Sequence, residues 1–440
     1  MSSADAGSGV AGADSGSGAG SAGAASASGG AGGTSTGGSG GGAGAGSATM
    51  VGVGAQSIKV DVIYADLSAL KALGPSYDNG NVPQQWQAMI DGWRRDHLLP
   101  VNGRDINLVF HTYNVLSQAD QRSACVAATQ DDKAFAVIGV AYFQTGAECV
   151  AREHHTPLIT FDGPEVPTFQ RSAPYLFSID QASDRLLNNF MYWAESRHAL
   201  AGHHIGLYYA NDAQTGALMN RTVKAQLAHF GYKIAAEATT GDGNGGPEDA
   251  VAVQRFESAR VDLALLFTSK TGFMQAAQAQ GYKPTYLESD FLYGTADVTT
   301  STYPASEFDG TFGITTQSGG EASAGIPPTP GMAACIHNYE RYSGMSNMSP
   351  SSAAYGYVLI ACDEGAALLG GLQRAGANLN TGTFIAGVEG LASFQLVRDL
   401  GAGTFGRQKH DAANTYRTLQ WRRGCSCWVA MGYPAPLWIS

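Results

Sequence analysis

Residues 135–163 read FAVIGVAYFQTGAECVAREHHTPLITFDG and contain three successive elements. Ala136–Val140 is a short β-branched run, a helix is expected around Ala147–His154, and Pro157–Phe161 is a second apolar run. A strand, a helix and a strand in this order predict a βαβ unit with two parallel strands. The right-handed crossover rule then places helices on both faces of a parallel sheet.

The same alternation extends to both sides of this unit. Strands are predicted at Ile58–Tyr64 and Ile106–Phe110, with helices at Trp86–His97 and Gln118–Thr129. After a strand at Tyr175–Ile179 the cycle restarts, with helices at Arg185–Arg197, Leu218–His229, Glu248–Ala259 and Phe273–Gln280 and strands at Ile205–Tyr209, Tyr232–Glu237, Val261–Phe267 and Thr285–Leu287. Two consecutive runs predict two similar α/β lobes with parallel-sheet cores.

The last 130 or so residues do not repeat this cycle. They contain a predicted strand at Thr311–Thr315, long helices at Ala353–Arg374 and Phe384–Leu391, and a terminal pair of strands at Phe394–Val397 and Tyr416–Trp421. This part is too short and irregular for a third lobe. We expect it to cross back and complete both lobes.

Composition excludes several classes of function. The chain has 440 residues, and 26 basic against 37 acidic side chains give a net charge of −11. This acidic balance argues against nucleic-acid binding, since no basic patch is available for phosphates. The sequence also lacks an apolar run of the length that spans a membrane.

The segment 1–56 is predicted to be a flexible Gly/Ala/Ser-rich linker. Residues 1–50 hold 18 of the 58 glycines and too little apolar surface to offset chain entropy. The first basic residue is Lys59, so no conventional signal peptide is expected in the sequence as given. Two interpretations stay open: a linker alone, or a linker that followed a clipped or missed secretory or lipoprotein signal.

The six cysteines favour disulfides over a metal site. None forms a CxxC pair and no histidine stands at zinc-finger spacing. An even count fits three disulfides in an oxidising compartment, although six cysteines allow fifteen connectivities. The sequential pairing is preferred: Cys125–Cys149, Cys335–Cys362 and Cys425–Cys427. Reduced thiols in a cytosolic protein are the alternative.

Motifs for cofactors, metals and catalysis are weak. Residues 241–246 match GxGxxG, but they do not follow the first strand of the fold and Pro247 comes directly after them. The pairs His154–His155 and His203–His204 are adjacent residues that point apart, so no metal is expected. No GxSxG lies on a strand–helix turn of the ordered region. We therefore expect no cofactor and no enzyme.

Polar and aromatic residues gather where the predicted strands end. Ligands of open α/β sheets bind beyond the carboxyl ends of the strands, and aromatics with a few polar groups suit a small molecule. Any single loop of this kind is explained by turn formation. Six such loops in two lobes favour a shared cleft, with the candidate ligand-binding residues Asp66, Tyr142, Phe143, Gln144, Thr145, Thr160, Phe161, Asp162, Asn211, Asp212, Thr268, Glu288 and Asp290.

From about Ser57 to Trp428 the chain resembles the type I periplasmic solute-binding proteins of ABC transporters, in particular the leucine/isoleucine/valine-binding branch. The resemblance rests on four stretches in order: IKVDVIYADLSALKALG, the unit at 135–163, HHIGLYYANDAQTGALMNRTVKAQLAHFGYKI and VDLALLFTSKTGFMQAAQAQGYKPTYLESD. Each motif is degenerate, and their order is the specific signal.

The resemblance implies two Rossmann-like lobes joined by three crossings, near Phe177–Ile179, Thr311–Thr316 and Leu391–Ser393. Lobe one is then 57–178 plus 316–392, and lobe two 179–315 plus 393–440. It also implies a non-enzymatic, extracytoplasmic protein that delivers a small ligand to permease subunits. Family members are often lipid-anchored through an N-terminal cysteine, but this sequence has none before Cys125, so an anchor requires an upstream segment.

Departures from the family bear on the ligand. Thr145 and Thr160 match positions that donate to a ligand carboxylate, but Asp162 would repel one. Glu288 or Asp290 resembles the family's acid that holds an ammonium. With Asp162 and Asp212, they predict an amine, a cationic amino-acid derivative or a polyol. The alternatives are a sensor that passes closure to a signalling partner, an α/β enzyme using the same cleft, and a scaffold without ligand.

Overall fold

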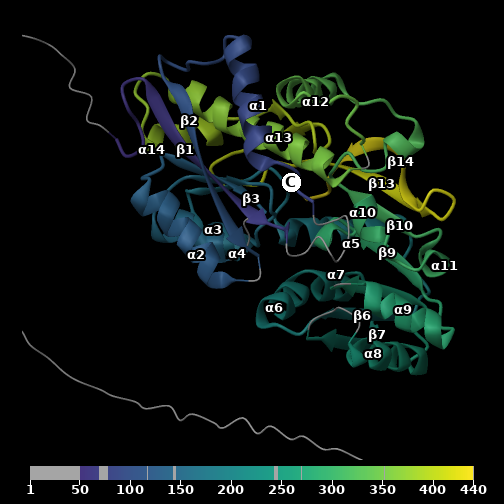
Figure 1. The fold of residues 1–440 in the computed structure, drawn as a ribbon. Coiled ribbons are helices and arrows are strands. Elements are labelled where there is room, and N and C mark those ends of the chain that lie inside the picture. The colour runs from purple at the N-terminus through teal and green to yellow at the C-terminus, as the bar shows by residue number, and fades with distance from the viewer. Residues whose placement is uncertain are drawn as a thin grey trace, which may run out of the picture. The chain divides into compact units, whose positions relative to one another are not determined.

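The computed structural model describes residues 50–68, 78–115, 117–141, 145–241, 246–268, 270–350 and 352–439. These residues form two large sheets and the helices that pack on them (Figure 1). The prediction of an α/β protein with parallel-sheet cores is confirmed.

The first sheet has five parallel strands in the order β2-β1-β3-β4-β5. Their bounds are β1 Ser57–Asp66, β2 Asp105–Asn114, β3 Ala136–Val140, β4 Leu158–Thr160 and β5 Leu176–Ser178. The register aligns Val62 of β1 with Phe110 of β2 and Ile138 of β3. The β3 strand is buried along its whole length, as expected for an apolar run covered on both faces.

Helices cover both faces of this sheet. Figure 1 shows α2, α3 and α4 grouped on one side of β1–β3, with α1, α13 and α14 on the other. Their bounds, with the two π-helical turns, are α1 Val82–Arg95, α2 Gln118–Val126, η3 Ala127–Asp131, α3 Thr145–Glu148, η4 Cys149–Glu153, α4 Val166–Ser172, α12 Pro330–Ser343, α13 Ala353–Ala375 and α14 Thr381–Glu389. The α1 helix begins where the Asn81 side chain accepts the Gln84 N–H. In its last turn Arg94 and Arg95 interact favourably with the negative end of the helix dipole.

The second sheet has seven strands in the order β14-β13-β10-β9-β8-β6-β7. The parallel strands are β6 Ile205–Ala210, β7 Ile234–Thr240, β8 Leu263–Phe267, β9 Thr285–Ser289 and β10 Phe312–Thr315. An antiparallel hairpin of β13 Thr415–Arg422 and β14 Cys427–Pro436 adds to β10. The helical elements after β5 and before α12 are α5 Ser183–Ser196, α6 Ala213–Arg221, α7 Val223–His229, α8 Pro247–Ser258, α9 Thr271–Gln280, η5 Phe291–Tyr293, α10 Asp297–Thr300, α11 Ala305–Phe308 and η6 Ala322–Ala324.

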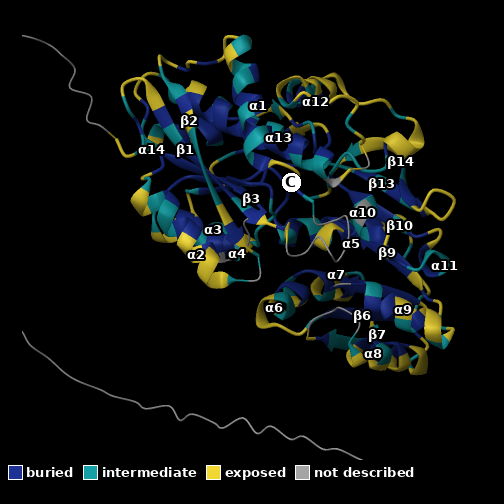
Figure 2. Cartoon of the chain, in the orientation of Figure 1, coloured by how far each residue is buried: buried dark blue, intermediate teal, exposed yellow. Residues whose placement is uncertain are grey.

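The core of the first sheet includes residues far along the chain. Ile360, Leu368 and Leu372 of α13 pack with the buried strands, and Leu396 and Phe405 join them. In Figure 2 the inner strands β1 and β3 are mostly dark, whereas the edge strand β2 and the outer helix faces are mostly intermediate or exposed. Segments after β10 therefore return to the first core before β13 and β14 join the second sheet. The exact lobe boundaries stay a prediction.

Several details differ from the sequence-based expectations, among them the helix expected at Leu218–His229, which is divided into α6 and α7 at Thr222. The helix expected at Ala147–His154 is α3 followed by the π-helical turn η4. The terminal strands expected at Phe394–Val397 and Tyr416–Trp421 lie in different sheets. Phe394–Gln395 (β11) pairs with Ala402–Gly403 (β12), whereas β13 pairs with β10 and with β14. The sequence analysis did not identify the β14 strand.

Candidate functional site

The loop after β4 places an acidic side chain at the carboxyl end of the first sheet. Thr160 is fully buried, and its Oγ1 lies 2.9 Å from both the Gly139 carbonyl oxygen and Asp162 Oδ2. The same oxygen accepts the Asp162 backbone N–H at 3.1 Å. These contacts fix the turn, so Thr160 orients Asp162. The Thr160 hydroxyl is itself already hydrogen-bonded within the protein.

Aromatic rings flank this acid. Phe161 is buried and meets the edge of Tyr357, from α13, with the ring centroids 6.0 Å apart. The guanidinium of Arg398 lies over the Phe161 ring at 5.3 Å. Burial raises the pKa of the Tyr357 hydroxyl, and the negative charge of Asp162 raises it further. Asp162, Tyr357 and Arg398 therefore share one electrostatic environment.

Tyr293 adds a partly exposed ring from the second sheet. It ends η5, which follows β9, and it is 41% exposed. Leu292 and Tyr293 both have positive φ, 52° and 58°, which non-glycine residues rarely adopt. Such strain is concentrated at ligand clamps and similar sites. Burial of the Tyr293 hydroxyl raises its pKa, and the negative charge of Asp162 raises it further.

A buried polar network lies next to these residues. Arg398 Nη1 donates to Asp399 Oδ1 at 3.1 Å and lies 3.7 Å from Asp180 Oδ2. Asp180 also accepts the Thr316 hydroxyl at 3.2 Å and the Gln317 side chain at 3.4 Å. These five residues come from the segments after β5, after β10 and before β13. The network therefore ties together three parts of the chain that leave or approach the two sheets.

Asp363 of α13 holds the Arg398 segment by its backbone. Its two carboxylate oxygens accept the N–H groups of Val397, Arg398 and Asp399 at 2.6, 2.9 and 3.2 Å. Burial raises the pKa of Asp363 to about 7, and the three backbone donors oppose that shift. Asp363 thereby fixes the position from which Arg398 reaches Asp180.

Two predicted ligand acids of the second sheet have internal partners. Glu288 forms a buried ion pair with Lys270, and burial raises its pKa to about 7 against the favourable effect of the lysine. Asp290 accepts the Thr295 hydroxyl, and at 2.6 Å the backbone N–H of Thr316. Both carboxyls support the ends of β9 and β10.

The other predicted site residues are spread over the strand ends. Asp66 accepts the Ser68 N–H at 2.9 Å, and Asp212 caps α6 by accepting the Thr215 N–H at 2.8 Å. Asn211 is exposed and Thr268 is buried. The remaining predictions lie outside the described residues, namely Tyr142, Phe143, Gln144 and the side chain of Thr145.

Sequence reasoning missed Asp180, Tyr293, Tyr357 and Arg398. Asp180 and Tyr293 follow the ends of β5 and β9, so the search for polar and aromatic residues after strand ends could have identified them. Tyr357 lies within α13 and Arg398 in an irregular segment, where no local signal marks them. Only tertiary packing brings these two residues to Phe161.

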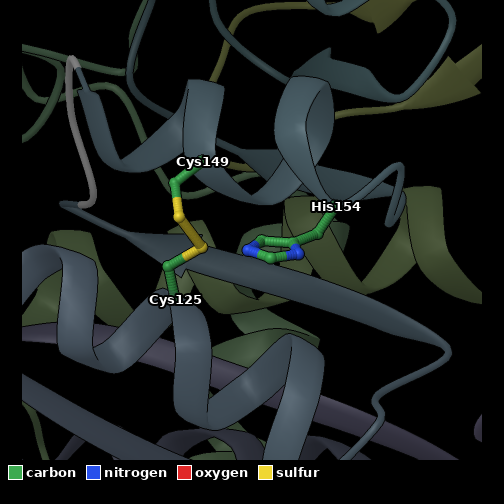
Figure 3. Close-up of side chains that lie close together, drawn as sticks. All are labelled: Cys125, Cys149 and His154. Carbon is green, nitrogen blue, oxygen red and sulfur yellow. A yellow bond between two sulfur atoms is a disulfide. The ribbon is translucent and has the colours of Figure 1, made fainter. Parts of the chain in front are cut away.

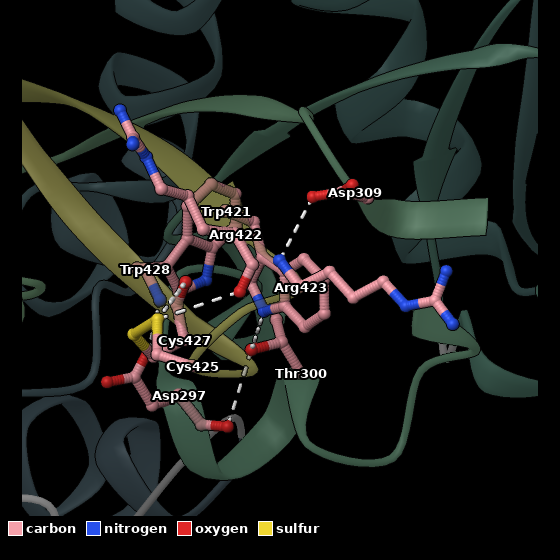
Figure 4. The surroundings of a disulfide bond; sticks show 9 residues. All are labelled: Asp297, Thr300, Asp309, Trp421, Arg422, Arg423, Cys425, Cys427 and Trp428. Atoms are coloured by element: carbon pink, nitrogen blue, oxygen red, sulfur yellow. Dashed lines mark hydrogen bonds between the residues drawn. A yellow bond between two sulfur atoms is a disulfide. The ribbon is translucent and has the colours of Figure 1, made fainter. Parts of the chain in front are cut away.

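The three disulfides have the predicted sequential pairing: Cys125–Cys149, Cys335–Cys362 and Cys425–Cys427. Figure 3 shows His154 beside the first of them. Disulfide sulfurs are not thiolates, so this group is no zinc site. Figure 4 shows the third, in the turn that joins β13 to β14.

Two cavities are lined by residues other than the group around Asp162. One of about 280 Å³ lies between α1, α12 and α13, beside Cys335 and Cys362. Another of about 300 Å³ is lined by Arg122 and Cys149. Neither contains Asp162 or its aromatic neighbours. Among the described residues, no helix has the length and apolar character needed to cross a membrane.

Comparison with known proteins places the chain in a family. The family model named periplasmic binding protein matches residues 99–426. No curated protein matches the sequence. By fold, the chain is similar to a branched-chain amino acid ABC transporter protein from Thermus thermophilus with bound valine (15% identity, TM-score 0.66, covering 87% of this chain and 98% of that one).

Two further structures have the same fold and come from proteins described with other ligands. An ABC transporter solute-binding protein from R. palustris in complex with 4-hydroxybenzoate is 14% identical, with a TM-score of 0.66, covering 87% of this chain and 98% of that one. A fatty acid ABC transporter substrate-binding protein from Thermomonospora curvata is 15% identical, with a TM-score of 0.65, covering 89% of this chain and 95% of that one. At these identities the likeness shows the fold alone, and it confirms the two-lobed fold class.

Proposed function

Because the chain belongs to the periplasmic binding protein family, we propose that it is the extracytoplasmic solute-binding component of an ABC importer. Its cargo is a small polar ligand with an ammonium group, such as an amine or an amino-acid derivative. The observation that carries this proposal is the group formed by Phe161, Asp162, Tyr293, Tyr357 and Arg398 at the carboxyl ends of the strands.

The chemistry of this group favours a cation over a carboxylate. Asp162 supplies a negative charge whose field reaches Tyr293 and Tyr357, and an ammonium gains from a carboxylate and from aromatic rings. Arg398 is engaged with Asp180 and Asp399, so its charge is already balanced. A ligand carboxylate about 4 Å from Asp162 would be opposed by roughly 4 kcal/mol at an intermediate dielectric.

A ligand at this site also explains how binding is signalled to a permease. Asp162 follows β4 of the first sheet, whereas Tyr293 follows β9 of the second. A ligand that contacts both favours the arrangement in which the two sides are close, because only differential contacts shift such an equilibrium. The ligand-bound form is then the one recognised by the permease subunits.

The test is a thermal-shift screen followed by calorimetric titration. The panel contains amines, amino acids, polyols, 4-hydroxybenzoate and fatty acids. A ligand at 1,000 times its Kd should stabilise the protein by about 4 kcal/mol and raise its Tm by several degrees. We expect the shift from compounds that carry an ammonium group. Shifts from carboxylates without an amine would refute the cationic ligand.

Variants then assign the site. Asp162→Asn removes a charge-assisted hydrogen bond worth about 1.5–3 kcal/mol, so affinity should fall about 10- to 150-fold. Glu257→Gln is the matched control, because Glu257 is an exposed acid on α8. Equal affinity of the Asp162 variant and the control would remove Asp162 from the site. A panel without any shift would count against solute binding itself.

A further inference from the structure

Three metal-ligating side chains from β1, β2 and the end of η3 lie close together. His111 Nε2 is 3.2 Å from Asp61 Oδ2 and 2.8 Å from Asp132 Oδ2. Asp61 lies in the middle of β1, His111 near the end of β2, and Asp132 directly after η3. We propose that these three residues bind a divalent transition-metal ion, for which Zn²⁺ is the reference probe.

The burial of Asp61 favours a cation bound to its carboxylate. Its side chain is fully buried within a strand whose neighbours Val60 and Val62 are also fully buried. Asp61 Oδ1 is buried and has no hydrogen-bond partner among the described residues. His111 contacts Oδ2 of this carboxylate, but buried charges in proteins are normally fully hydrogen-bonded and paired, or bound to a metal. An ion held by this carboxylate would compensate its charge.

The spacing of the ligand atoms fits a small ion. Nitrogen and oxygen ligands lie at about 2.1 Å from Zn²⁺, so neighbouring ligand atoms of a tetrahedral site are about 3.4 Å apart. The separations of 3.2 and 2.8 Å from His111 Nε2 need to widen by only a few tenths of an ångström. One imidazole and two carboxylates are a donor set suited to first-row divalent ions. They leave a fourth position for water.

The charges nearby are also compatible with a cation. Lys59 donates to the Asp132 carbonyl oxygen at 2.6 Å and lies 3.8 Å from Asp132 Oδ1. Lys59 therefore lies on the Oδ1 side of Asp132, whereas His111 contacts Oδ2. With neutral His111, two carboxylates and one ammonium leave one negative charge. The lysine reduces affinity for the ion without occupying its position.

A bound ion would hold η3 against β1 and β2. Asp132 comes from the helical layer, whereas Asp61 and His111 come from the sheet. Without a metal, the same contacts are explained by a protonated His111 that bridges the two carboxylates, and its pKa is raised by them. The two explanations differ in one observable, which is saturable binding of a metal ion.

The experiment uses the full chain after treatment with a chelator. Titration with ZnCl₂ in a calorimeter should show one saturable site, and the Tm should rise with Zn²⁺ concentration. Asp132→Asn and His111→Gln should each weaken binding by at least about tenfold, as expected for loss of a ligand. Asp131→Asn is the matched control, because Asp131 is the exposed neighbour of Asp132, and it should leave affinity unchanged.

Co²⁺ gives a second readout that does not depend on stability. Tetrahedral Co²⁺ with a nitrogen ligand absorbs visible light strongly, and the band should be present in the wild type and lost in His111→Gln. Absence of saturable binding would overturn the proposal. Binding of equal affinity in Asp132→Asn, His111→Gln and Asp131→Asn would overturn it too, because the ion would then lie elsewhere.

Discussion

Replacement of Arg398 by methionine should strongly destabilise the fold at neutral pH. Arg398 is 7% exposed and is the cation between Asp180 and Asp399. Methionine has a similar length but removes the cation that contacts both buried carboxylates. The change therefore tests whether the polar network between the sheets is held by this one side chain.

The expected magnitude follows from these contacts. Removing one partner of a buried ion pair typically costs about 3–5 kcal/mol. The loss of the contact with the Phe161 ring adds about 0.5–1 kcal/mol. Protonation of Asp180 or Asp399 limits the total, because a neutral acid tolerates burial better. We therefore expect a loss of about 3–5 kcal/mol at pH 7 and a smaller loss at pH 5.

The measurement is urea unfolding at both pH values, followed by fluorescence and circular dichroism together. Coincident transitions allow a single free energy of unfolding to be used. Arg407→Met is the control, because Arg407 is exposed, and surface changes are usually within about 0.5 kcal/mol. A loss below about 1 kcal/mol for Arg398→Met at pH 7 would refute the reasoning. So would a larger loss at pH 5 than at pH 7.

Three further predictions concern stability. A Cβ at Gly206 would lie 2.5 Å from the Phe256 ring, so Gly206→Ala should destabilise the fold by about 1–3 kcal/mol. A Cβ at Gly216 in α6 meets nothing within 4 Å, so Gly216→Ala should stabilise the fold by about 0.5–1 kcal/mol. Equal effects of the two substitutions in thermal unfolding would contradict this. Burial raises the pKa of Glu288 from 4.5 to about 7. The protonated carboxyl therefore contributes fully to the free energy of unfolding below pH 4.5, and this contribution falls by roughly 3 kcal/mol as the pH rises to 7. Glu288→Gln should lack this slope, and parallel pH profiles of Tm would exclude it. The double variant Cys335→Ala/Cys362→Ala removes a disulfide with a sequence separation of 27 and should destabilise the fold by about 3.5 kcal/mol through loop entropy. Removal of the Cys425–Cys427 disulfide, with a separation of 2, should cost less. The reverse order in denaturant unfolding would contradict this prediction.

The fold was predictable because its strands have a strong local signal. Parallel strands are covered on both faces, so β3 and β8 are continuous apolar runs that the sequence displays directly. The β14 strand was missed because Gly432, Pro434 and Pro436 interrupt its pattern. The α12 helix was also missed, although Met332, Cys335, Ile336 and Tyr339 have helical spacing and Thr329 caps it.

The site was harder to predict than the fold because its residues are joined by tertiary contacts. Strand ends led to Thr160, Phe161 and Asp162, which lie at or directly after the end of β4. Tyr357 and Arg398 reach Phe161 from segments about 200 residues later in the chain, which periodicity does not reveal. The burial of Glu288 against Lys270 depends on the neighbouring ends of β8 and β9 in the folded sheet.

The number of acids near the strand ends overstates the negative charge that a ligand meets. Glu288 is paired with Lys270, and Asp290 accepts hydrogen bonds from Thr295 and Thr316. Asp212 caps a helix, so its charge is also used locally. Asp162 also accepts a hydrogen bond, from Thr160, but its charge acts on the partly exposed residue Tyr293. Recognition of a cation should therefore depend on one acid and its aromatic neighbours, and selectivity among amines should follow the shape of their apolar parts.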